Sequence, residues 1–136
     1  MNFTRKQFDE LTYEIIGAAI DVHRTLGPGL LESVYHHCMK VALEDRCISY
    51  ETELKVPLEF NGRLLDAPLR CDLFVENKIV VELKSVQTLI PVHEAQIMTY
   101  MKLLRVPKGI LLNFYCSNLF KEGQRTYVNE LFKQLK

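Results

Sequence analysis

Two stretches near the N-terminus repeat apolar residues with the spacing of a helix. Residues 8–26 are predicted to form a first helix that stops at Gly27-Pro28-Gly29. Residues 31–46 are predicted to form a second helix. The positions expected to face the core are Leu11, Ile15, Ala18, Ala19, Val22 and Leu26 in the first helix, and Leu31, Val34, Tyr35, Cys38, Val41 and Ala42 in the second.

The middle of the chain changes to the two-residue alternation that is typical of β-strands. Apolar and polar residues alternate over positions 54–60, which predicts one strand. Asn61-Gly62 is a strong signal for a tight hairpin turn. A second strand is therefore expected after this turn, and it is predicted to reach about Val75.

The second half of the chain alternates strands with a helix. The β-branched run at residues 79–86 predicts the most regular strand, after a short turn at Glu76-Asn77-Lys78. Pro91 suits the first turn of a helix that runs to about residue 104. Residues 109–115 predict a strand buried on both faces, and residues 125–128 a short strand before a frayed helix. The order α-α-β-β-β-α-β with a tail indicates an α/β or α+β sheet packed against helices.

Length and charge narrow the class of protein. A chain of 136 residues is long enough to bury its own core, so we expect one domain over residues 1–136. Seventeen Lys and Arg balance seventeen Asp and Glu, which excludes a strongly basic, histone-like protein but not a local basic patch. The chain shows neither an apolar run of membrane-spanning length nor a secretory signal. A cytoplasmic protein that makes no membrane contact is expected.

The four cysteines do not show the spacing of a zinc site. They are Cys38, Cys47, Cys71 and Cys116. The simpler interpretation is that they are reduced, partly buried thiols. Iron–sulfur ligation is the alternative, and it would require the fold to bring them together.

Two charged residues interrupt one face of the predicted central strand. Glu82 and Lys84 share this face with Val80 and Val86. If the turn before the strand has three residues, Asp72 lies directly opposite Glu82, and Arg70 lies opposite Lys84. A two-residue turn would instead place Asp72 on the other face.

Two neighbouring carboxylates require a cation or a shared proton between them. Mg²⁺ held by Asp72 and Glu82 is the functional interpretation, with Lys84 holding an attacking water or stabilising charge on a phosphate. The alternative is a structural ladder of ion pairs formed by Arg70, Asp72, Glu82 and Lys84.

Further polar residues on the two flanking helices are candidates for the same site. His93, Gln96 and Tyr100 share a predicted helix face, whereas Ile97, Met101 and Leu104 are expected to face elsewhere. This face looks onto the acidic site or is simply solvated. His93 is a metal ligand or a residue that caps its helix.

Glu32 lies in the first turn of the second predicted helix. It is a candidate third acidic ligand beside Asp72 and Glu82. The alternative is a glutamate that favours the positive end of a helix.

The residues Gly29-Leu30-Leu31-Glu32-Ser33-Val34-Tyr35 read G-x-x-E-x-x-Y. This motif resembles the signature of the small bacterial GxxExxY proteins, which are placed in the PD-(D/E)xK nuclease superfamily. The resemblance runs from about Leu11 to Phe114. It also includes Ile16-Gly17-Ala18-Ala19 with His23, Arg70-Cys71-Asp72-Leu73, Val81-Glu82-Leu83-Lys84 and Pro91-Val92-His93-Glu94-Ala95-Gln96.

The resemblance implies an α/β, restriction-endonuclease-like core in which helices flank a mixed sheet of about four strands. It implies that Asp72 is the motif aspartate and that Glu82 and Lys84 form the E-x-K motif. Glu32 matches an acidic residue that many members carry on the helix before the sheet. Cys71 stands where some members have proline, which is a small departure.

The resemblance further implies hydrolysis of phosphodiester bonds with Mg²⁺ or Mn²⁺ held by Asp72, Glu82 and Glu32. Lys84 is expected to position water or stabilise the transition state. Gln96 and Tyr100 match the Q-x-x-x-Y of RecB-like members. The implied catalytic set is Glu32, Asp72, Glu82, Lys84, Gln96 and Tyr100, with Arg70, His93 and Tyr35 in support.

The sequence leaves the substrate open. A nuclease that acts on DNA rather than RNA is favoured, with a structure-specific role or one in repair or defence. The alternative is a catalytically silent module that binds nucleic acid or a protein partner, which the zero net charge favours. A homodimer is preferred to a monomer because no separate recognition domain is visible. A defence nuclease that acts with an unidentified partner protein is a third hypothesis.

Overall fold

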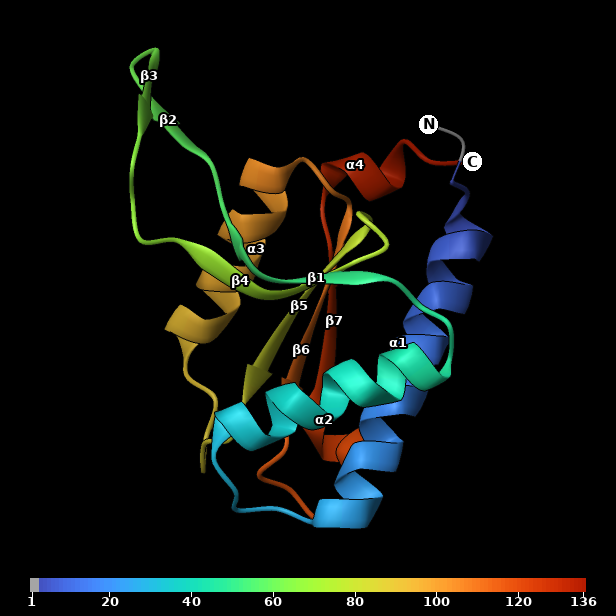
Figure 1. The fold of residues 1–136 in the computed structure, drawn as a ribbon. Helices are drawn as coiled ribbons and strands as arrows, with labels where there is room; N and C mark the ends of the chain where they lie inside the picture. The colour runs from blue at the N-terminus through green and yellow to red at the C-terminus, as the bar shows by residue number, and fades with distance from the viewer. Residues whose placement is uncertain (1–2) are drawn as a thin grey trace.

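The computed structural model describes residues 3–136 (Figure 1). The elements are α1 (Arg5–Leu26), α2 (Glu32–Asp45), β1 (Tyr50–Lys55), β2 (Leu58–Phe60), β3 (Arg63–Leu65), β4 (Arg70–Val75), β5 (Ile79–Lys84), α3 (Pro91–Leu104), β6 (Lys108–Asn113), a π-helical turn (Leu119–Gly123), β7 (Gln124–Val128) and α4 (Glu130–Lys133). The predicted order is confirmed, except that each of the first two predicted strands is divided in two. No helix within residues 3–136 is long and apolar enough to cross a membrane.

Helix α1 begins earlier than predicted because of a capping box. The Thr4 hydroxyl accepts the Gln7 N–H at 3.1 Å, and the Gln7 side chain accepts the Thr4 N–H at 2.8 Å. The helix ends at Gly27, whose φ of 72° is one that residues with a side chain rarely adopt. The predicted apolar stripe is largely confirmed, since Ile15 and Val22 are both buried.

The predicted core face of α2 was wrong at three positions. Leu31, Val34 and Val41 are exposed, whereas the buried stripe consists of Tyr35, Met39 and Leu43. Leu31 lies outside the helix as its N-cap residue, which shortens the apolar face at its start. Val34 and Val41 lie seven residues apart and so share the opposite, solvent-facing side of α2.

Five strands form one mixed sheet in the order β1-β4-β5-β6-β7. Strands β5 and β6 are parallel and are joined through α3, whereas the other neighbours are antiparallel. Helices α1 and α2 pack on one face of the sheet and α3 on the other, so each face has its own core cluster (Figure 1). The predicted mixed α/β architecture is confirmed, with five strands where about four were expected.

The remaining two strands, β2 and β3, form a separate hairpin that projects from the body of the protein (Figure 1). Pro57 divides the predicted 54–60 strand because proline has no N–H to give to a sheet. The predicted turn is confirmed: Phe60 pairs with Arg63, and Asn61 and Gly62 between them have φ of 52° and 75°.

Strand β6 is buried along its whole length, as predicted for a strand covered on both faces. Gly109 lets α3 lie close to this strand. A Cβ at this position would meet the Met101 sulfur at 2.7 Å and Ile97 at 3.1 Å. The absent side chain therefore sets the distance between α3 and the sheet face that carries Glu82.

Tyr35, the last residue of the G-x-x-E-x-x-Y motif, fastens the α1–α2 loop to the sheet. Its ring stacks on Phe114 with centroids 4.3 Å apart and an interplanar angle of 6°. Its hydroxyl donates to the Gly27 carbonyl oxygen at 2.5 Å and accepts the Leu30 N–H at 3.2 Å. The motif tyrosine thus fixes the loop that precedes Glu32.

The Tyr35→Phe variant is expected to lose about 1–2 kcal/mol of unfolding free energy, because two loop groups lose their hydrogen-bond partner while the stacked ring remains. Urea unfolding measures this loss. Tyr13→Phe is the matched control and should leave stability unchanged, since Tyr13 is 75% exposed. Equal stability of Tyr35→Phe and the unmodified protein would contradict the anchoring role.

Candidate functional site

The acidic pair lies where β4 and β5 stop pairing. The predicted three-residue turn is present, and Val75 pairs with Ile79 across it. The ladder then continues only as far as Leu73 opposite Val81. The next position along each strand is the predicted pair, Asp72 and Glu82.

Beyond that point, hydrogen bonds from backbone N–H groups to side-chain carboxylates replace the backbone ladder between the strands. The Asp72 N–H donates to the Glu82 carboxylate at 2.7 Å, and the Leu83 N–H donates to the Asp72 carboxylate at 2.8 Å. Each carboxylate is thus held by the backbone of the opposite strand. The crossed bonds place two acidic groups side by side.

Burial raises the pKa values of both acids, and the Asp72 charge adds to the increase at Glu82. Glu82 is only 4% exposed, and loss of solvation followed by the nearby Asp72 charge raises its pKa to about 8. Loss of solvation also raises the pKa of Asp72, against the opposing effects of the Leu83 N–H and Lys84. The metal-free site therefore holds a proton at neutral pH.

The alternative ladder of ion pairs is not formed. Neither Arg70 nor Lys84 makes a salt bridge in the part of the chain that the structure describes. Arg70 is exposed at the start of β4, and Lys84 is half-buried at the end of β5. The Lys84 charge still lowers the pKa of both acids, so it acts on the pair without neutralising it by contact.

Two residues of α3, which covers the sheet face that carries Glu82, are candidates for the site. The Gln96 amide donates to the Tyr100 hydroxyl at 3.2 Å. Burial and then the charge of Glu82 raise the pKa of Tyr100, so this hydroxyl lies near the acids. The predicted separation of helix faces was wrong for Tyr100, which is 3% exposed and packs with Ile97 and Met101 in the α3 core cluster.

His93 and Glu32 lie apart from the pair. The His93 ring accepts the Ile90 N–H at 3.1 Å, which is the capping role that the sequence left open for it. Glu32 is exposed in the first turn of α2 and makes no side-chain hydrogen bond within residues 3–136. Across the same residues, no three His, Cys, Asp or Glu side chains converge closely enough to hold a metal ion.

Sequence reasoning missed two residues beside the acidic pair, His36 and Glu53. The His36 ring donates to the Asp72 carbonyl oxygen at 3.2 Å and lies 3.1 Å from the Thr52 hydroxyl. Its other nitrogen lies 3.8 Å from the Glu53 carboxylate. The one available signal was that His36 follows Glu32 by a single helical turn.

Glu53 is opposite Asp72 in register but does not pair with it. Its neighbours Thr52 and Leu54 pair with Leu73 and Cys71. Glu53 has φ of 52°, a backbone conformation that is strained for a residue with a side chain. Its charge adds to the increase in the pKa of both Asp72 and Glu82.

Comparison with known protein families identifies the superfamily of the chain. Residues 9–126 match the PD-(D/E)XK nuclease superfamily. The chain belongs to this superfamily. Searches of curated proteins and of solved structures find no match. Nucleases of this superfamily typically use Mg²⁺ or a similar divalent metal.

The acidic pair fits the divalent metal that the superfamily implies. Hard cations prefer carboxylate oxygens, and one or two carboxylates with water suffice for Mg²⁺. A cation between Asp72 and Glu82 would stabilise their charged forms, which burial disfavours. The donor set is therefore that of a two-carboxylate site completed by water.

The metal-free protein is expected to lose stability as the pH rises. Glu82 ordinarily ionises near 4.5, but in the fold it keeps its proton up to about pH 8. The folded state therefore holds more protons over this range, and stability falls from pH 4.5 to 8 by on the order of 4 kcal/mol. Urea unfolding in EDTA at several pH values measures this slope.

Glu82→Gln should flatten the slope and be more stable than the unmodified protein at pH 8, since the amide carries no charge to bury. The control is Glu51→Gln, which changes an exposed glutamate of β1. An unchanged slope in Glu82→Gln would show that another group titrates.

Proposed function

We propose that the protein is a Mg²⁺- or Mn²⁺-dependent nuclease that hydrolyses phosphodiester bonds in DNA. The observation that carries the proposal is the pair of crossed hydrogen bonds that holds Asp72 and Glu82 side by side. Membership of the nuclease superfamily supports the reaction class. The G-x-x-E-x-x-Y motif supports the narrower assignment to the GxxExxY proteins within it.

Asp72 and Glu82 would hold the metal, which when bound polarises a phosphoryl oxygen and lowers the pKa of a coordinated water. Lys84 follows Glu82 by two residues on the same face of β5, and no carboxylate of residues 3–136 forms a salt bridge with it. Its ammonium group is free to orient the attacking water or to stabilise negative charge on the phosphate. Tyr100 would support the site from α3, with its hydroxyl held by the Gln96 amide.

The remaining predicted residues have supporting roles in this proposal. Tyr35 holds the loop before Glu32, His93 caps α3, and Arg70 offers an exposed cation at the start of β4. Glu32 would join the site through a water molecule rather than as a direct ligand. A homodimer and a cytoplasmic location stay predictions.

A binding module without turnover is the second candidate, and the zero net charge is the observation that favours it. Nonspecific affinity for nucleic acid comes from neutralised phosphates, and this chain carries no excess of cations for that purpose. The two candidates differ in whether metal binding is followed by cleavage.

Substitutions in the pair and at Lys84 separate metal binding from chemistry. Asp72→Asn is expected to abolish Mn²⁺ binding in isothermal titration and to abolish cleavage. Lys84→Met should retain Mn²⁺ binding but lower the cleavage rate by about 10²–10³-fold, because it removes only transition-state stabilisation. The measurement is metal-dependent cleavage of linear, flapped and branched DNA, with RNA in parallel.

Lys6→Met is the control, since Lys6 is exposed on α1, and it should behave as the unmodified protein. Mn²⁺ binding that Asp72→Asn leaves intact would contradict the assigned metal site. Binding that depends on Asp72, without cleavage of any substrate, would favour the silent module.

Glu32→Gln tests the water-mediated role of Glu32. Its exposed position predicts a loss of Mn²⁺ affinity smaller than tenfold, against complete loss in Asp72→Asn. The same titration measures both variants. Loss of binding in Glu32→Gln as complete as in Asp72→Asn would make Glu32 a direct ligand.

A further inference from the structure

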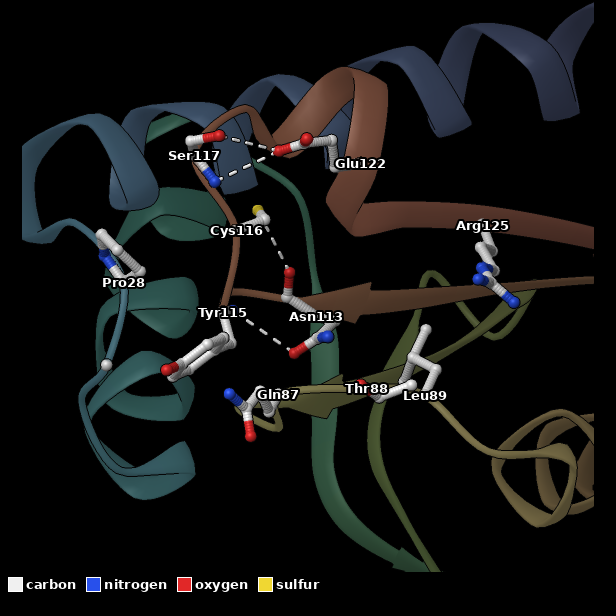
Figure 2. A pocket seen from close by; sticks show the side chains of 11 residues that line it. Pro28, Gln87, Thr88, Leu89, Asn113, Tyr115, Cys116, Ser117, Glu122 and Arg125 are labelled. Atoms are coloured by element: carbon white, nitrogen blue, oxygen red, sulfur yellow. Dashed lines mark hydrogen bonds between the residues drawn. The ribbon is translucent and has the colours of Figure 1, made fainter.

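An open cleft of about 670 Å³ lies beyond the carboxyl ends of the parallel strands β5 and β6 (Figure 2). It is lined by the segment that follows β5, by the segment that follows β6 and by Arg125 of β7. Crevices at the carboxyl ends of strands are the usual ligand sites of α/β sheets. Neither the acidic pair nor Lys84 lines this cleft, so its occupant is distinct from the metal.

The cleft opens on the sheet face that carries Glu82. Paired residues of neighbouring strands project to the same face, and Glu82 pairs with Leu111, which pairs with Arg125. Lys84 likewise pairs with Asn113, which lines the cleft. Two strand spacings separate Glu82 from Arg125, which is about 10 Å. Leu111 between them is buried. A ligand that reaches both the acidic pair and the cleft would therefore pass over the strand ends, where Lys84 pairs with Asn113.

Two polar side chains hold the walls of the cleft in place. The Asn113 amide binds the Val86 backbone through both of its ends, accepting the N–H at 3.1 Å and donating to the carbonyl oxygen at 2.9 Å. The Glu122 carboxylate accepts the Ser117 hydroxyl at 3.0 Å and the Asn118 N–H at 3.1 Å, and these hydrogen bonds lower its pKa. The Asn113 amide is thereby occupied, as is Oε1 of Glu122, whereas Oε2 of the exposed Glu122 carboxylate stays open to solvent.

The groups that remain available are an aromatic ring, an amide and a guanidinium. Tyr115 is 43% exposed, and within residues 3–136 neither its hydroxyl nor the exposed Gln87 amide makes a hydrogen bond. Arg125 lies 3.8 Å from Glu94, with about half of each side chain exposed, and its charge also lowers the pKa of Tyr127 against the larger effects of burial and Glu94. Figure 2 shows Tyr115 and Gln87 at one end of the cleft and Arg125 at the other.

We propose that this cleft binds one unpaired nucleotide adjacent to the phosphodiester bond held at the acidic pair. Its base stacks on Tyr115 with Gln87 at the base edge, and Arg125 meets a phosphate. A base inside a duplex cannot present its face to a side chain, so the cleft selects a single-stranded or frayed nucleotide. The inference rests on the proposed nuclease function and narrows its substrate to nucleic acid with such a nucleotide.

Fluorescence anisotropy with two labelled DNA molecules tests the proposal, with Ca²⁺ in place of Mg²⁺ to limit turnover. One is a blunt duplex and the other is the same duplex with a short single-stranded overhang. The unmodified protein should bind the overhang more tightly. Tyr115→Ala should weaken overhang binding by about 5- to 150-fold, the range for a stacked base, and leave blunt binding unchanged.

Tyr115→Phe keeps the ring and should keep the preference. Arg125→Gln should weaken overhang binding and lower its salt dependence by about one phosphate contact. Tyr13→Ala removes an exposed aromatic ring from α1 and should change neither affinity. Circular dichroism of each variant shows that the fold is retained.

Equal affinity for the two DNA molecules, binding of neither, or a preference that survives Tyr115→Ala would overturn the inference. Cleavage assays with Mg²⁺ and Mn²⁺ then separate it from the proposed function. If DNA is cleaved but the protein shows no preference for the overhang, the nuclease function stands and the nucleotide-binding cleft is rejected. If the overhang preference depends on Tyr115 but no substrate is cleaved, the nucleotide-binding cleft stands and the nuclease function is rejected.

Discussion

The burial of two acidic side chains, Asp72 and Glu82, side by side is the constraint on which the surrounding structure depends. Two carboxyl groups in a poorly solvated site can share it only if at least one stays protonated or a cation lies between them, and they would move apart if their side chains were free. The backbone N–H groups of the opposite strands prevent this, at the cost of the regular ladder between β4 and β5. From the α2 side, His36 holds the same stretch of β4 through the Asp72 carbonyl oxygen.

This arrangement makes the site a local weakness in a sheet that is otherwise well packed. Glu53 adds a strained backbone and a third negative charge at the point where the strands separate. Such strain persists only where the rest of the fold is rigid enough to impose it. The buried β6 strand and the stacked pair of Tyr35 and Phe114 provide that rigidity. The acidic pair thus lowers the free energy of unfolding, and a cation bound between its carboxylates would raise it again.

Local sequence signals predicted the parts of the fold that depend on neighbouring residues. The three-residue turn before β5 gave the correct register for Asp72 and Glu82, and Asn61-Gly62 gave the hairpin. Long-range contacts were not accessible in this way. Glu53 reaches the site only because β1 pairs with β4, and His36 only because α2 packs across that pair. The face of α2 was misjudged for the same reason, since its apolar residues occupy more than one side of the helix.

The β2–β3 hairpin is attached to the body only through the segments that leave β1 and enter β4. It forms its own two-stranded sheet, and its turn is specified within its own sequence. Changes to its length or to its exposed side chains, including Phe60 and Leu64, would therefore leave the core undisturbed. The chain re-enters the main sheet at Arg70, two residues before Asp72. The hairpin is thus an arm whose fold is specified by its own residues and whose base lies directly beside the acidic pair.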